Sequence, residues 1–169
     1  MIRDCARIVD ANPTIDDLWV YDHVAIPPDE AEGSEGYYLD PLATLAFITA
    51  VTERVKISTQ VLILPYRAPL PTAKWIASIQ QLSGGRLLLG AGVGWMEAEF
   101  NALGIDRSRR SKITDETLAF LNECFNAKDD LVTANGQTFL FRSKPKRPPI
   151  YVGGAEPHAL HRAVKYGDG

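Results

Sequence analysis

Cysteine is scarce in this sequence, and so are histidine, excess basic charge and long apolar runs. The two cysteines, Cys5 and Cys124, lie far apart and outside any metal-ligand spacing. A disulfide framework is therefore not expected, and a reducing compartment, the cytoplasm, is predicted. The net charge of −3 at pH 7 provides no basic field that would attract nucleic acid. An acid interrupts the N-terminal residues early, and apolar runs are short, so neither a secretory signal nor a membrane span is expected.

The sequence does contain a regular alternation of strand-like and helical patterns. Strands are predicted at 17–21, 55–64, 87–94 and 150–154. Helices are predicted at 2–10, 41–48, 74–82, 112–126 and 157–166. Strands that alternate with helices imply an α/β fold with a parallel sheet. The doubly wound sheet and the barrel both meet this description.

Two further features refine this prediction. The strand at 55–64 is apolar on both faces, as a buried parallel sheet requires. Residues 131–141 differ, because two short strand-like arms flank Asn135-Gly136, a strong hairpin signal, and we expect an excursion outside the main sheet. Trp19 and Trp75 are predicted to lie in the core.

Unusual residues cluster at the carboxyl ends of the predicted strands, where active sites lie in both architectures. These ends read Tyr21-Asp22-His23, Leu64-Pro65-Tyr66-Arg67, Gly92-Val93-Gly94-Trp95 and Gly153-Gly154. Their coincidence predicts one shared site.

Each of these groups also has a simpler structural interpretation. Gly153 and Gly154, between a strand and a helix, suit an anion such as phosphate or a tight turn. Gly90-Ala91-Gly92-Val93-Gly94 fails the dinucleotide-binding pattern, because Trp95 occupies the third glycine position. His23 suits general acid–base chemistry, but a lone histidine more often caps or packs.

No metal site is predicted. His158 and His161 stand three residues apart on a predicted helix near Glu156, without further ligands in the pattern.

Several separated motifs together resemble the luciferase-like monooxygenase family, and most closely its branch of F-420-dependent oxidoreductases. These motifs are Trp19-Val20-Tyr21-Asp22-His23, the stretch from Val55 to Arg67, Gln81 to Arg86, Gly90 to Trp95 with Glu99-Phe100, Pro149 to Gly154, and Tyr166 to Gly169. The resemblance covers nearly the whole chain in one consistent order.

The resemblance implies a TIM-barrel type fold that binds coenzyme F-420, or alternatively FMN. At 169 residues the chain is short of the roughly 250 of a complete barrel. We therefore expect one domain over 1–169, an incomplete barrel of about four parallel strands with a hairpin excursion. The implied reaction is hydride transfer between the coenzyme and a small organic substrate.

The same resemblance implies roles for particular residues. His23 would be the catalytic proton donor or acceptor, with Asp22 as a coenzyme contact. A bulge, often with a non-prolyl cis peptide, would place Thr59, Gln60 and Val61 against the coenzyme ring. The other implied coenzyme contacts are Gly94 and Trp95 at the pocket border, and Gly153 and Gly154 at the phosphate.

Two other functions stay open at this point. One is an FMN-dependent monooxygenase of the same fold, and the other is a non-catalytic coenzyme-binding or assembly subunit. An incomplete barrel leaves open sheet edges that pair readily with another chain. We therefore expect a homodimer or a complementing chain.

Overall fold

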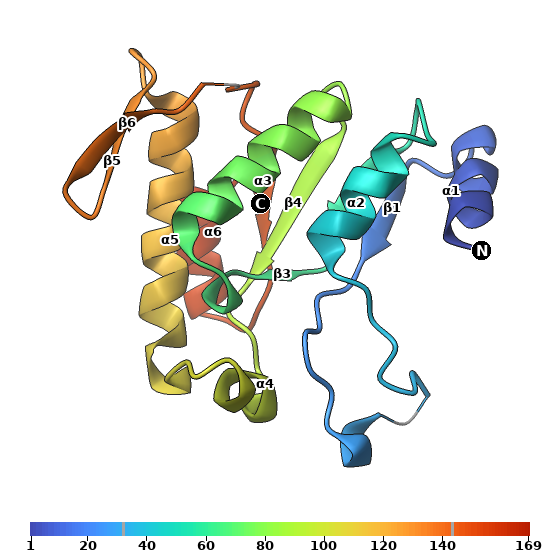
Figure 1. Cartoon of the computed structure of the whole chain (residues 1–169), viewed down its shortest axis with the longest axis horizontal. Helices are drawn as coiled ribbons and strands as arrows, with labels where there is room; N and C mark the ends of the chain where they lie inside the picture. Colours follow the sequence, from blue (N-terminus) through green and yellow to red (C-terminus); the bar gives the residue numbers. More distant parts are fainter. Residues whose placement is uncertain (32, 143) are drawn as a thin grey trace.

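A parallel sheet forms the centre of the molecule (Figure 1). The computed structural model describes residues 1–31, 33–142 and 144–169. The strands are β1 Asp17–Val20, β2 Lys56–Thr59, β3 Leu62–Ile63, β4 Leu87–Gly92, β5 Leu131–Ala134, β6 Gln137–Leu140 and β7 Ile150–Val152. The α-helices are α1 Ile2–Ala11, α2 Pro41–Thr49, α3 Pro69–Leu82, α4 Glu97–Ala102, α5 Arg110–Asn126 and α6 His158–Tyr166. Single-turn 3-10 helices are η1 Pro28–Glu30, η2 Leu64–Tyr66 and η3 Arg107–Arg109.

The order of the strands selects the barrel over the doubly wound sheet. β1 pairs with β2, both β2 and β3 pair with β4, and β4 pairs with β7, always in parallel. Because β2 and β3 are two parts of one extended segment, the spatial order equals the chain order. A doubly wound sheet reverses its order at a switch point, whereas a barrel continues in one direction. The predicted fold class, with four parallel strand segments, is confirmed.

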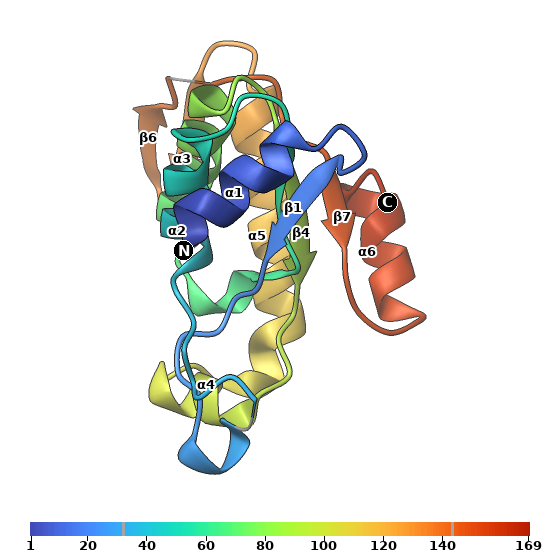
Figure 2. The same ribbon diagram turned by 90° about the vertical axis from the view of Figure 1, so that its right-hand side faces the viewer.

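Helices cover one face of the sheet (Figure 1). α2, α3 and α5 lie together on this face. Figure 2 shows α6 beside β7, the strand at the opposite edge of the sheet from β1. The largest fully buried side chains are Phe100, Leu45, Ile48, Ile57, Leu62, Leu64, Ile76, Ile79, Leu87, Leu89, Leu118 and Leu121. Most of them join in one core between the sheet and these helices.

The opposite face of the sheet carries exposed aromatic residues, and here one expectation is wrong. Leu18 packs against the core, so the next residue, Trp19, points away from the helices and is 38% exposed. Tyr151 on β7 follows buried Ile150 in the same way and is 41% exposed. Trp75 is also half exposed, on α3, so neither of the two tryptophans lies in the core.

The hairpin prediction is confirmed. β5 and β6 pair antiparallel around Asn135 and Gly136, both with positive φ, and form a sheet of their own. Two helices differ from prediction. α3 begins at Pro69 instead of 74, since proline suits the first turn of a helix. α4, after Trp95, was not predicted at all. None of the described helices is long and apolar enough to cross a membrane.

Candidate active site

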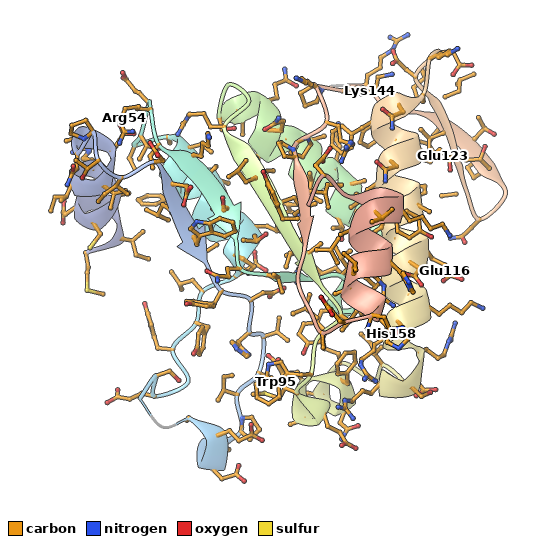
Figure 3. All side chains as sticks on the ribbon, turned by 180° about the vertical axis from the view of Figure 1, so that it is seen from behind. Arg54, Trp95, Glu116, Glu123, Lys144 and His158 are labelled. Carbon is orange, nitrogen blue, oxygen red and sulfur yellow. The ribbon has the colours of Figure 1, made fainter. Side chains whose placement is uncertain are left out.

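A pocket of about 310 Å³ opens at the carboxyl ends of β1, β3 and β4. It is lined by Tyr21, Asp22, His23, Gln60, Val61, Ile63, Tyr66, Trp95 and Glu99. The prediction that strand ends converge on one site is therefore met for the first three strands. Figure 3 shows Trp95 at this end of the sheet, and His158, at the start of α6, lies toward the same end.

Asp22 joins the end of β1 to the segment after β3. Its carboxylate is fully buried and accepts a hydrogen bond from the Ile63 amide at 2.8 Å. The Arg67 guanidinium binds both carboxylate oxygens, at 2.6 and 2.9 Å, and also reaches Asp40 at 2.9 Å. Burial would lower the pKa of Arg67, but its hydrogen bonds to Asp22 outweigh this and raise it. Asp22 therefore holds the walls of the pocket together, and its contact with a coenzyme stays a prediction.

Asp40 links this ion pair to α2. One carboxylate oxygen caps the helix by accepting from the Ala43 amide at 2.8 Å, while the other pairs with Arg67. Burial alone would raise the pKa of Asp40, yet the Ala43 amide and the Arg67 guanidinium together lower it. The buried pair thus extends from the pocket wall to a helix N-terminus.

His23 lies in the pocket wall and contacts a buried carboxylate that sequence reasoning did not identify as functional. His23 Nδ1 is 3.3 Å from Oε2 of Glu99, whose side chain is 1% exposed. The same oxygen accepts from the Tyr66 hydroxyl at 2.8 Å. The ring of Tyr38 packs against the imidazole, with 4.7 Å between ring centroids. His23 is thereby fixed between an acid and an aromatic ring.

Tyr66 remains a proton donor in this network. Burial raises the pKa of its hydroxyl far above the ordinary value, and the hydrogen bond to Glu99 raises it further. The ring packs edge-on against Phe100, which follows Glu99 on α4. Four pocket residues were not assigned a site role from the sequence: Tyr21, Ile63, Tyr66 and Glu99. Glu99 belongs to the Glu99-Phe100 motif of the family resemblance, but no pattern in the sequence separates it from the exposed Glu97 on the same helix.

The predicted bulge falls at residues 59–61. The peptide bond between Gln60 and Val61 is cis, and the extended segment is interrupted here between β2 and β3. The Thr59 hydroxyl donates to the Gly90 carbonyl at 2.7 Å. Gln60 and Val61 line the pocket, whereas Thr59 is buried beneath it.

The glycines of β4 make room for this bulge. A Cβ at Gly90 would lie 2.0 Å from the Thr59 carbonyl oxygen, and one at Gly92 would lie 2.4 Å from Val61 Cγ2. A Cβ at Gly153, beyond the end of β7, would lie 2.9 Å from Val61 Cγ1. Val61 therefore rests directly on glycine backbone from β4 and the β7 end. This packing explains the glycine run without a nucleotide-binding loop.

Gly94 and Trp95 continue from β4 into the border of the pocket. Gly94 has φ +75°, and a Cβ there would lie 2.7 Å from Ile63 Cγ2, so both backbone and space favour glycine. Trp95 lines the pocket and is 63% exposed. The contact of Gly94 and Trp95 with a coenzyme stays a prediction.

Gly153 and Gly154 differ from each other. The Gly153 amide donates to the Ala91 carbonyl at 2.8 Å, within the sheet ladder. Gly154 has φ +142°, which side chains rarely adopt, and begins the loop that leads to α6. Of the two predicted phosphate contacts, Gly154 is the better placed to offer its amide, while Gly153 is required by the contact with Val61. Within the described part of the chain, no three His, Cys, Asp or Glu side chains form a metal-binding group.

The comparison with known protein families decides the family. The sequence profile described as luciferase-like monooxygenase matches residues 2–169. The chain belongs to the luciferase-like monooxygenase family. Among curated relatives of the family, the 5,10-methylenetetrahydromethanopterin reductase of Methanolobus tindarius is 28% identical over 91% of this chain and 44% of its own length.

Solved structures share the fold of this chain. An F-420-dependent secondary alcohol dehydrogenase, in complex with an F-420–acetone adduct, superposes with a TM-score of 0.78 and 23% identity, over 99% of this chain and 50% of that one. A second structure is the oxygenating constituent of 3,6-diketocamphane monooxygenase from the CAM plasmid of Pseudomonas putida, in complex with FMN. It superposes with a TM-score of 0.70 and 18% identity, over 89% of this chain and 44% of that one. The chain spans about half the length of the relatives it matches.

Proposed function

We propose that this protein is a cytoplasmic oxidoreductase that binds coenzyme F-420, with hydride transfer to or from a small organic substrate. The observation that carries this proposal is the position of His23: it lies in the pocket wall at the strand ends, held by Glu99, beside the bulge at Val61. Membership of a family with named reductases and monooxygenases supports redox chemistry. Bound coenzyme would supply the hydride chemistry itself.

The residues present fit such a coenzyme. Val61 offers an apolar surface in the pocket wall, and the glycines beneath it allow it to sit there. Gly154, at the loop before α6, has φ +142°, a backbone conformation that residues with a side chain rarely adopt. A ring system would therefore bind near Val61 and Trp95, and a phosphate near Gly154, where the helix N-terminus favours an anion.

The protein's own part in the reaction would be orientation and proton management. His23 would give or take a proton at the ring nitrogen that does not contact Glu99. The buried pair of Asp22 and Arg67 would keep the two sides of the pocket at a fixed separation. Tyr66 stays protonated and supports the carboxylate beside His23.

FMN is the alternative coenzyme, since a solved neighbour of the same fold is complexed with it. Fluorescence titration of the purified protein with each coenzyme distinguishes the two. We expect saturable binding of F-420 and weaker binding of FMN; the reverse order would favour an FMN-dependent monooxygenase. Binding without any turnover of reduced coenzyme would favour a non-catalytic subunit.

The role of His23 is tested by replacement with alanine. Where turnover is measured, His23→Ala should lower the rate by about a hundredfold, the usual scale for a general acid or base. His161→Ala, an exposed histidine on α6, is the matched control and should leave the rate unchanged. If His23→Ala keeps its activity while its melting temperature collapses, the histidine is structural.

A further inference from the structure

Glu99 is a buried carboxylate with four hydrogen-bonding partners. Oε1 accepts from the backbone amides of Val24 at 2.6 Å and Ala25 at 3.1 Å. Oε2 accepts from the Tyr66 hydroxyl at 2.8 Å and faces His23 Nδ1 at 3.3 Å. A buried carboxylate is costly unless it is hydrogen-bonded, and these contacts occupy both of its oxygens.

Three of these four partners donate a hydrogen bond to the carboxylate, and this determines which nitrogen of the fourth partner, His23, carries a proton. Backbone amides can only donate, and the Tyr66 hydroxyl, protonated because of its burial, donates as well. A carboxylate surrounded by donors is stabilised as the anion. An anionic oxygen accepts from His23, so Nδ1 must carry a proton. In the neutral imidazole the other nitrogen, Nε2, is then the acceptor.

The other groups around the imidazole do not compete for this proton. Asp22, the adjacent residue, is bound through both oxygens to Arg67 and through one to the Ile63 amide. Tyr38 contacts the ring by stacking. Glu99 is the acidic group in direct contact with the imidazole among the described residues.

We infer that Glu99 is the positioning residue of this site, which fixes His23 as the Nδ1–H tautomer and leaves Nε2 to exchange a proton with a ligand in the pocket. The inference rests on the proposed function for its catalytic meaning, but the tautomer itself is a property of the protein without coenzyme. Glu99 would thus do for His23 what a buried carboxylate does for the histidine of many acid–base sites.

The test is the tautomer of His23, measured by ¹⁵N NMR of the imidazole in the protein without coenzyme. The chain has three histidines, and His158 and His161 are exposed on α6, so single replacements assign every signal. At a pH where His23 is neutral, we expect the Nδ1–H form to exceed the other by about tenfold, on the scale of one charge-assisted hydrogen bond. A predominant Nε2–H form would overturn the inference.

Glu99→Gln provides the decisive variant. The Val24 and Ala25 amides require an acceptor, so they orient the glutamine oxygen toward themselves and its NH2 group toward His23. Nδ1 must then accept, and the tautomer should switch to Nε2–H. Glu97→Gln, an exposed acid on the same helix, is the control and should leave the tautomer unchanged.

Tyr66→Phe keeps the carboxylate and removes one donor, so the tautomer should stay Nδ1–H. If Glu99→Gln does not fold, the tautomer of His23 measured in this variant and in the unmodified protein decides whether Nδ1 carries the proton. An unchanged tautomer in folded Glu99→Gln contradicts the role of Glu99, whatever the coenzyme titration shows. Conversely, a switched tautomer in a protein that binds neither coenzyme confirms the positioning and refutes the proposed function.

Discussion

Replacing Gly92 with alanine tests how the bulge is seated on the sheet. The new Cβ would lie 2.4 Å from Val61 Cγ2, more than 1 Å inside ordinary contact, whereas its next neighbours, Val61 Cβ and Ile63 Cδ1, are at 3.4 and 3.8 Å. Overpacking of this kind costs about 1–3 kcal/mol. Val61→Ala removes the offending methyl group, so the added Cβ should fit in the double variant.

The magnitudes follow from a double-mutant cycle. Val61→Ala alone removes two methyl groups from a half-buried side chain and should cost about 1 kcal/mol. In that background Gly92→Ala should cost about 0.5 kcal/mol or less, which gives a coupling of about 0.5–3 kcal/mol. Urea denaturation monitored by circular dichroism measures all four free energies of unfolding. If Gly92→Ala alone does not fold, a folded double variant is itself the expected rescue.

Gly90→Ala is the matched control for this cycle. Its Cβ would lie 2.0 Å from the Thr59 carbonyl oxygen, which is backbone and cannot be removed by Val61→Ala. The cost of Gly90→Ala should therefore be similar with valine or alanine at position 61. Equal costs of Gly92→Ala in both backgrounds would refute the placement of Val61 on the β4 glycines.

Three further predictions concern the coenzyme, acid stability and assembly. Gly154→Ala should weaken coenzyme affinity in a fluorescence titration by about tenfold. The control is Gly104→Ala, at another glycine with positive φ and open space around it, and this variant should keep its affinity. Equal affinities of the two variants would mean that Gly154 serves only as a turn residue. The Ile150 amide, with Arg147, lowers the pKa of Asp168 in the folded protein. The ionised carboxylate therefore stabilises the fold at any pH above the pKa that Asp168 has in the unfolded chain, and this stabilisation is lost as the pH falls through the lower pKa of the folded protein. Asp168→Asn should therefore be less stable than the unmodified protein in urea denaturation at pH 7, with a difference that narrows below about pH 4; a constant difference contradicts this. Light scattering behind a sizing column should give a homodimer with twice the mass of the 18.6 kDa chain. Within residues 1–31, 33–142 and 144–169, β1 pairs on one side only, and the exposed aromatic residues Trp19 and Tyr151 lie on the sheet face opposite the helices. A monomer at micromolar concentration contradicts this prediction.

The sheet was predictable because its signals are local. The segment 55–64 is rich in β-branched and aliphatic residues, and Asn135-Gly136 favours a hairpin turn by its own backbone preferences. The barrel-like order and the bulge at Gln60 and Val61 came from the family resemblance, because periodicity carries no information on which strands are neighbours. Trp19 was misplaced although Leu18 and Val20, as apolar neighbours, already left it on the opposite face of β1.

Glu99 could not be assigned from the sequence for a physical reason. Its partners Val24 and Ala25 lie 75 and 74 positions away, and Tyr66 lies 33 positions away. A short acidic helix shows no pattern that separates a buried acid from solvated ones, and Glu97 on the same helix is exposed. The barrel-like sheet brings these segments to one end, and only there does the acid acquire its role.

Coenzyme mapping by backbone NMR tests the central claim most directly. Titration of labelled protein with F-420, and separately with FMN, should shift the amide signals of residues 22–24, 60–62, 94–96 and 153–155. Signals from the hairpin at 131–140, which forms its own sheet, should remain in place. Shifts confined to the strand-end segments would support the coenzyme site proposed at the carboxyl ends of the strands. Shifts spread over the hairpin or α1, or none with either coenzyme at saturating concentration, would contradict it.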